Sequence, residues 1–249
     1  MMLHLCTWPE VEERLKRSAG IIVPIGSTEQ HGPNGLIGTD ALCAEVVARG
    51  VGEQADALVA PTVSVGMAQH HLGFPGSMTL RPSTLIAVVR DIVRSLARHG
   101  FDRIYFLNGH GGNIATLGAA FSEVYADTSL DGAGDNVCGP RCRLKNWYDG
   151  PAVKRLSQEL FGGAEGSHAT PSEVSLTQYA FPEAIKRANM TPKIAPKGPI
   201  RDAADYRRRF PDGRIGSDPS LASPEAGKRL YEAAVTEVTA DYLEFLSAE

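Results

Sequence analysis

The 249-residue sequence lacks the features that identify several large classes of protein. Its apolar stretches are too short to span a bilayer, and its first residues continue into a charged amphipathic segment without the cationic start of a signal peptide. The net charge is −4 and no basic tract is present, which disfavours nucleic acid as a partner. We therefore expect a cytoplasmic protein with neither a membrane nor a nucleic-acid partner.

Cysteine is also scarce, and the four cysteines follow no paired framework. Three residues separate Cys138 from Cys142 without a second Cys or His pair at zinc-finger spacing, so we expect free thiols. The hydrophobic share of 43% and the charged share of 22% are ordinary for a globular protein. The length is enough for one large α/β domain, which we expect to span residues 1–249.

Short apolar runs alternate along the chain with segments of helical periodicity. We expect strands at 21–26, 57–66, 103–109 and 142–149, and helices at 8–18, 40–53, 82–99, 113–127, 151–161 and 224–247. This alternation predicts an α/β fold in which helices cover both faces of a mostly parallel central sheet. Residues 186–222 are rich in Pro, Arg and Gly with little periodicity, so we expect them to form a surface excursion.

Polar side chains follow the ends of two predicted strands. Glu29, His31 and Asp40 lie in GSTEQHGPNGLIGTD after the first strand, and His110 lies in FLNGHGGN after the third. The carboxyl ends of parallel strands meet at one edge of a sheet, so we expect these side chains to converge. Two carboxylates and two imidazoles suit Zn, Mn or Fe(II) better than Ca or a thiolate-bound metal. A divalent metal here predicts hydrolysis through an activated water.

The local sequence supports this placement. Glu29 and His31 are two residues apart and point the same way in an extended segment. Asp40 stands near the start of a helix, where backbone N–H groups hold a carboxylate, and Asn113 is a candidate N-cap for the helix after His110. Singly, each residue has an ordinary explanation as a cap or a solvated loop side chain. Their shared position after buried strands favours a metal site.

A second metal ion would need a further oxygen ligand, and Glu173 in GSHATPSEVS is the candidate. His168 lies five residues before it and is a candidate proton acceptor or donor, because imidazole titrates near neutral pH. Pro171 and Ser172 with Glu173 also resemble the start of a surface helix. His70 and His71 precede LGFPGS, and they would form a second ligand pair, line a substrate pocket or lie in a plain surface turn.

Taken in order, GSTEQHGPNGLIGTD, FPGSMTL, NGHGGN and HATPSEVS resemble the creatininase family of metal-dependent amidohydrolases. The resemblance implies a three-layer α/β/α fold, a dinuclear metal centre and a homo-oligomer, often a hexamer. It implies that Glu29 and His110 hold one ion, that His31 holds the other and that Asp40 bridges them.

By the same resemblance, His168 and Glu173 belong to a His-x4-Glu pattern beside the metals and are the candidate catalytic residues. Glu173 is also the candidate ligand of the second ion. The candidate substrate-binding residues are His71, Gly76, Ser77, Gly111 and Glu165.

The chain departs from the creatinine-cleaving members of the family. Gly111 and Gly112 stand where those enzymes carry bulky and acidic residues, and the acidic one is implicated there in metal binding. Ala164 stands where they use a tryptophan beside the substrate. These departures disfavour creatinine as the substrate and make the second ion depend on Glu173. Relatives with the GHGGN motif include formamide deformylases and a peptide-trimming enzyme.

We therefore predict a hydrolase with two divalent ions per chain, Zn, Mn or Fe(II), that cleaves a C–N bond in a small amide, formamide or cyclic amide rather than a peptide. One alternative is a catalytically impaired binding or regulatory protein, which the departures at Gly112 and Thr170 motivate. Another is a two-metal phosphoesterase, which is disfavoured because none of the four motifs contains the Arg or Lys that a phosphate favours.

Overall fold

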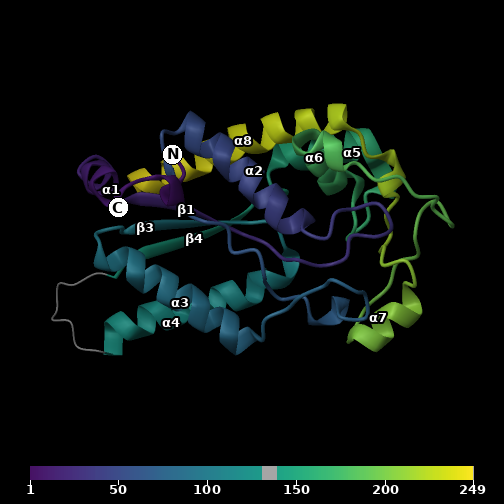
Figure 1. Ribbon diagram of the computed structural model, residues 1–249, viewed down its shortest axis with the longest axis horizontal. Helices are drawn as coiled ribbons and strands as arrows, with labels where there is room; N and C mark the ends of the chain where they lie inside the picture. The colour runs from purple at the N-terminus through teal and green to yellow at the C-terminus, as the bar shows by residue number, and fades with distance from the viewer. Residues whose placement is uncertain (131–138, 249) are drawn as a thin grey trace.

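The structure is a computed structural model that describes residues 1–130 and 139–248 (Figure 1). Within these residues the central sheet has four parallel strands in the order β2-β1-β3-β4. The strands are β1 Gly20–Ile25, β2 Leu58–Val59, β3 Arg103–Asn108 and β4 Arg141–Asn146. Ile25 pairs with Asn108, and Asn108 pairs with Asn146. The carboxyl ends of β1, β3 and β4 therefore stop at one level.

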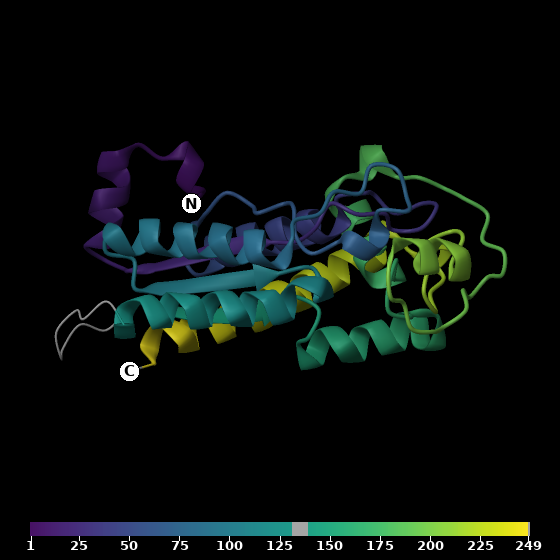
Figure 2. The same cartoon turned by 90° about the horizontal axis from the view of Figure 1, so that it is seen from below.

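Helices cover both faces of this sheet, as the sequence predicts. The described α-helices are α1 Trp8–Leu15, α2 Thr39–Gln54, α3 Pro82–Arg98, α4 Ile114–Leu130, α5 Pro151–Phe161, α6 Pro171–Ala180, α7 Ala203–Arg209 and α8 Pro224–Ser247. Helices α3 and α4 lie side by side on one face (Figure 2), and α2, α6 and α8 lie on the other. No helix in the described part of the chain combines the length and apolar character that a membrane crossing needs.

The apolar strands explain the two layers of core. Every residue of β1 is buried, because helices cover both of its faces. Ile22 packs in a cluster with residues of α2 and α8, whereas Ile21 and Val23 pack in a second cluster with residues of α3 and α4. This alternation follows from the two-residue period of a strand.

The second strand is shorter than the prediction of 57–66, since β2 ends at Val59. Pro61 has no N–H group to donate to a ladder, which interrupts the pairing with β1. The chain nevertheless continues beside β1, where the Val63 N–H donates to the Pro24 carbonyl at 2.9 Å. Cys6, Cys43 and Cys142 form no disulfide with one another, and Cys138 lies outside the described residues.

Segment 186–222 is the expected surface excursion only in its first half, since residues 186–204 are mostly exposed and buried residues gather after them. Its residues Tyr206, Phe210 and Ile215 form a buried cluster with Phe74 from a distant loop. The Arg214 side chain is fully buried, and its guanidinium donates to the Lys193 and Ser217 carbonyls and to the Asp212 carboxylate. The segment therefore has a small core of its own beside the strand ends (Figure 1).

Two glycines bring the start of α2 against the strand ends. A Cβ atom at Gly26 would overlap the backbone of Ala41, and one at Gly109 would overlap the carbonyl oxygen of Asp40. Both positions must therefore lack a side chain for α2 to begin where it does. This close approach holds Asp40 at the carboxyl edge of the sheet.

We predict that Gly109→Ala lowers the free energy of unfolding by about 1–3 kcal/mol, because the new methyl group overlaps backbone that cannot rotate away. The matched control is Gly118→Ala in α4, where nothing lies within 4 Å of the new Cβ. That change should be neutral or stabilise the helix by up to about 1 kcal/mol. Denaturant unfolding of the two variants measures both values, and equal stability of the Gly109 variant and the unchanged protein would contradict the packing argument.

Candidate metal centre

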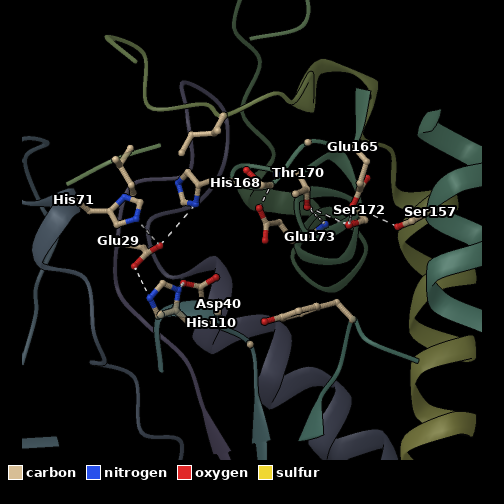
Figure 3. A pocket seen from close by; sticks show the side chains of 18 of the residues that line it. Glu29, Asp40, His71, His110, Ser157, Glu165, His168, Thr170, Ser172 and Glu173 are labelled. Carbon is tan, nitrogen blue, oxygen red and sulfur yellow. Dashed lines mark hydrogen bonds and ion pairs between the residues drawn. The ribbon is translucent and has the colours of Figure 1, made fainter. Parts of the chain in front are cut away.

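The structure brings the predicted ligands together in two groups that share Asp40, and a third group joins Glu29 and His31 to His168. The ligand atoms of Glu29, Asp40 and His110 lie within 4.8 Å of one another, and so do those of His31, Asp40 and Glu173. Figure 3 shows Glu29, Asp40 and His110 facing one another at one end of a pocket. Glu29 and His31 come from the loop after β1, Asp40 from the first turn of α2, and His110 from the loop after β3.

Each imidazole of these groups faces carboxylate oxygens. His110 Nδ1 lies 3.1 Å from Asp40 Oδ2, and His110 Nε2 lies 3.3 Å from Glu29 Oε2. His31 Nε2 lies 3.2 Å from Asp40 Oδ1 and 3.9 Å from Glu173 Oε1. The side chains of Glu29, His31 and Asp40 are almost wholly buried. Asp40 therefore lies between the two imidazoles.

Two oxygens of this cluster indicate that a cation belongs there. Among the described residues, Glu29 Oε1 and Asp40 Oδ2 are buried and accept no hydrogen bond. Ring nitrogens nevertheless lie 3.0 Å from Glu29 Oε1 and 3.1 Å from Asp40 Oδ2. Buried oxygens are rarely left unsatisfied, and facing oxygens and ring nitrogens without hydrogen bonds suit ligands that share an ion. The donor set of His and carboxylate groups fits Zn, Mn or Fe(II).

Contacts behind the ligands hold them in place. The Ser27 hydroxyl donates to Glu29 Oε2 at 2.8 Å. His31 Nδ1 lies 3.0 Å from the Glu29 carbonyl oxygen, which turns Nε2 toward Asp40. The Asn108 amide donates to the His110 carbonyl, and the His110 N–H donates back to Asn108 Oδ1. Such supporting contacts orient metal ligands.

Asn113 is not the N-cap that the sequence suggests. A short 3-10 turn at Gly111–Asn113 precedes α4, and the Asn113 side chain bonds the backbone of two other loops. Its Oδ1 accepts from the Met67 N–H at 2.9 Å, and its Nδ2 donates to the Gly26 carbonyl at 3.0 Å. Asn113 therefore joins the loops that follow β1, β2 and β3.

Glu173 is both a helix-start residue and a member of the second ligand group. The Thr170 hydroxyl accepts from the Glu173 N–H, and the Thr170 N–H donates to Glu173 Oε1 at 2.6 Å. This capping box opens α6. The cap fixes the carboxylate beside His31. Glu173 therefore both begins the helix and lies where a metal ligand is expected.

His168 lies beside the first ligand group. Its Nε2 lies 2.8 Å from the Gln30 carbonyl oxygen and 2.9 Å from the Gln30 side-chain nitrogen. Nδ1 lies 3.8 Å from Glu29 Oε1. Burial and the neighbouring His31 and His71 hold the pKa of His168 well below its usual value. The ring is therefore neutral at physiological pH.

The carboxylates and burial act in opposite directions on the ligand histidines. Burial lowers the pKa of His31, but Asp40, Glu173 and Glu29 outweigh it and raise that pKa to about 10. Burial also opposes Glu29 and Asp40 at His110, whose pKa rises to about 9. In the metal-free protein both imidazoles therefore carry a proton at neutral pH.

A cavity of about 700 Å³ opens over the ligand groups. Of the predicted substrate-binding residues, His71, Gly111 and Glu165 line it. Gly76 and Ser77 are not among its lining residues, since Ser77 faces the loop that carries the ligands and accepts a hydrogen bond there from the Gln30 N–H at 3.1 Å. His70, which stands beside His71 in the sequence, also lines the cavity, and the polar lining residues that sequence reasoning did not place there are Tyr148, Lys154, Ser157, Gln158, Ser167, Thr170 and Ser172.

Tyr148 was missed because the predicted strand 142–149 ends too late. Strand β4 stops at Asn146, so residues 147 and 148 enter the cavity instead of extending the sheet. The sequence did contain a signal for Tyr148. The residue follows a further strand of the same parallel sheet, and residues at such strand ends lie where the site forms.

A polar wall of Ser157, Glu165 and Ser172 lies opposite the imidazoles (Figure 3). Both serine hydroxyls donate to Glu165 Oε1. Within the described residues Glu165 Oε2 is buried without a hydrogen-bond partner. Burial raises the pKa of Glu165, against the effect of these hydrogen bonds.

Comparison with known proteins gives likenesses over nearly the whole chain. The chain matches the creatininase family, described as creatinine amidohydrolase, over residues 4–241. It is 29% identical over 242 residues to the creatinine amidohydrolase of Pseudomonas putida, covering 92% of this chain and 91% of that protein. It is 28% identical over 266 residues to the 3-dehydro-scyllo-inosose hydrolase of Thermotoga maritima, covering 96% of this chain and 80% of that hydrolase.

A shorter stretch of 106 residues is 42% identical to the mycofactocin precursor peptide peptidase of Mycolicibacterium smegmatis. It covers 40% of this chain and 42% of that peptidase, so less than half of each is aligned. Among solved structures, a mutant creatininase of the Zn–Zn type has a TM-score of 0.85 and 25% identity, covering 99% of this chain and 98% of that chain. The predicted three-layer fold is therefore confirmed.

We predict that zinc binding releases protons, because the ion must displace those held by His31 and His110. Both pKa values lie above the ordinary value, so the zinc affinity falls as the pH drops from about 9 to 6, by roughly tenfold per pH unit for each displaced proton. Titration calorimetry in two buffers of different ionisation enthalpy measures the number of protons. Zinc affinity that does not change over this pH range would refute the prediction.

Proposed function

This chain belongs to the creatininase family, as its four motifs predict, and on that premise we propose that it is a divalent-metal-dependent hydrolase of a C–N bond in a small amide, formamide or cyclic amide. The observation that carries the proposal is the pair of ligand groups that share Asp40 beneath a cavity large enough for such a substrate. The Zn–Zn type of a structural relative supports the choice of divalent ions.

Two ions per chain suit the geometry. Glu29 and His110 would hold one, His31 and Glu173 the other, and Asp40 would contact both. Divalent ions in such a site lower the pKa of water and polarise a carbonyl oxygen. A Cβ atom at Gly112 would overlap His110 Nε2, so this backbone has no room there for an acidic side chain. The second ion therefore depends on Glu173.

His168 moves the proton in this proposal. In this proposal its Nδ1, which lies 3.8 Å from Glu29 Oε1, is the proton acceptor. Nδ1 accepts the proton that water loses as the new C–O bond forms, and it gives that proton to the leaving nitrogen as the C–N bond breaks. The lowered pKa keeps the ring neutral and ready to accept.

The polar wall bears on the choice of substrate. Glu165 Oε2 is a buried acceptor that a hydroxyl or amino group of a substrate would satisfy. By the family resemblance, Ala164, next to Glu165, stands where creatinine-cleaving relatives have a tryptophan. We propose a substrate more polar than creatinine. The peptidase likeness makes a short peptide a necessary member of any test panel.

We predict that Asp40→Ala loses most of both ions and that Glu29→Ala loses most of one, because each removes a buried ligand. The control is Glu159→Ala, an exposed carboxylate that pairs with Arg229. Elemental analysis of the purified proteins gives the metal-to-protein ratio. If the Asp40 and Glu29 variants keep the metal content of the unchanged protein, the assignment of ligands is wrong.

The direct test uses zinc-loaded and manganese-loaded protein with a panel of formamides, cyclic amides, linear amides, creatinine, a short peptide and p-nitrophenyl phosphate. We expect turnover of at least one C–N substrate, and a loss of about 10²–10⁴ in kcat for His168→Ala with its metal content retained. His99→Ala, at an exposed helix end, is the control. Metal binding without turnover would favour a binding protein, and turnover of the phosphate ester alone would favour a phosphoesterase.

A further inference from the structure

We propose that Tyr148 is a further catalytic residue, whose hydroxyl donates a hydrogen bond to the oxygen of the scissile carbonyl as that oxygen gains negative charge. The inference rests on the proposed function, since it concerns the same cavity. Neither the motifs nor the ligand groups include Tyr148, and it follows from the position of one unpaired hydroxyl.

The end of β4 places Tyr148 at the metal centre. Because Asn146 pairs with Asn108 and Asn108 with Ile25, the residues after Asn146 enter the same edge of the sheet as the ligand loops. Tyr148 lines the cavity together with Asp40 and His110. Its hydroxyl lies 3.7 Å from the position that a Cβ atom on Gly111 would take, beside the loop that carries His110.

The glycine at position 111 gives the hydroxyl its access. A larger side chain there would fill the space between this loop and the phenol. Asp40 and Glu173 are close enough that their charges, after burial and Asp149, raise the pKa of Tyr148. A phenol ordinarily titrates near pH ~10, so the hydroxyl is a donor at neutral pH.

The Tyr148 hydroxyl makes no hydrogen bond to any described residue. By contrast, the Tyr105 hydroxyl donates to Asp241 at 2.7 Å, and the Tyr206 hydroxyl donates to the Gly213 carbonyl at 2.7 Å. Tyr148 is half-buried and lines the cavity, so its hydroxyl is free to meet a substrate there. The cavity is where a partner for Tyr148 would lie.

The donor is also held rigidly. The ring of Tyr148 packs edge-on against Trp147, with 5.8 Å between centroids, and against the apolar cluster beneath it. Asn108 donates to Asn146 Oδ1 at 2.8 Å, and the Trp147 N–H donates to the Asn108 carbonyl. A donor that is already in position needs no reorganisation when charge develops, which is the condition for stabilising an oxyanion.

The roles of Tyr148 and His168 are complementary. His168 Nδ1 lies 3.8 Å from Glu29 Oε1, whereas the Tyr148 hydroxyl lies beside Gly111, so the two side chains approach the centre next to different residues. During hydrolysis the C–O bond forms and the C–N bond breaks, and His168 carries the proton to nitrogen. Tyr148 keeps its own proton throughout and only donates a hydrogen bond.

The test compares Tyr148→Phe with Tyr231→Phe, which makes the same change at the contact between α8 and α2. Phenylalanine keeps the ring and its packing. With the zinc-loaded protein and the best C–N substrate, we expect Tyr148→Phe to lower kcat by about 10²–10³ with KM and metal content nearly unchanged. The Tyr231 variant should match the unchanged protein. A fall confined to KM, or no fall, would overturn the assignment.

A second readout does not depend on turnover. Methylphosphonate is a tetrahedral oxyanion, and calorimetry measures its binding to the zinc-loaded protein. We expect about tenfold or more weaker binding to Tyr148→Phe, the effect of one hydrogen bond to a charged oxygen. Equal binding by the two proteins would overturn the role of Tyr148. Weaker binding by the variant, in a protein that cleaves no C–N substrate, would uphold the donor and reject the proposed function.

Discussion

The buried carboxylate of Asp40 is the constraint on which the site depends. Burial alone would raise its pKa, but His31 and His110 hold the pKa below its usual range. An isolated buried carboxylate would cost several kcal/mol, so this one requires positive partners on both sides. The glycines at 26 and 109 follow from the same constraint, since they let the first turn of α2 reach the strand ends.

Around Asp40 the parallel sheet determines which residues meet. The strands β1, β3 and β4 end at one level, and the loop after each of them contributes a side chain to the cavity. Helix α6 adds Glu173 through its capping box, because the cap that begins the helix also points the carboxylate at His31. Secondary structure and ligand geometry therefore depend on the same few hydrogen bonds.

The parts of this site that depend on local sequence could be predicted. Glu29, Asp40 and His110 each follow or begin an element whose apolar pattern is clear, so their convergence follows from the order of strands. The rest depends on contacts between distant segments. The core around Tyr206 requires Phe74, and no local pattern connects the two. Tyr148 depends on a strand end that periodicity placed three residues too late.

Asn108 has a consequence for how the specificity of this site can change. Its side chain bonds the loop that carries His110 and also the turn that carries Tyr148. The two loops are therefore mechanically linked, and neither can shift without moving the other. The polar wall around Glu165 has no such link to Asn108. Substitutions in that wall would leave the reacting groups in place. New specificities are therefore more accessible there than through changes in the loops at the strand ends.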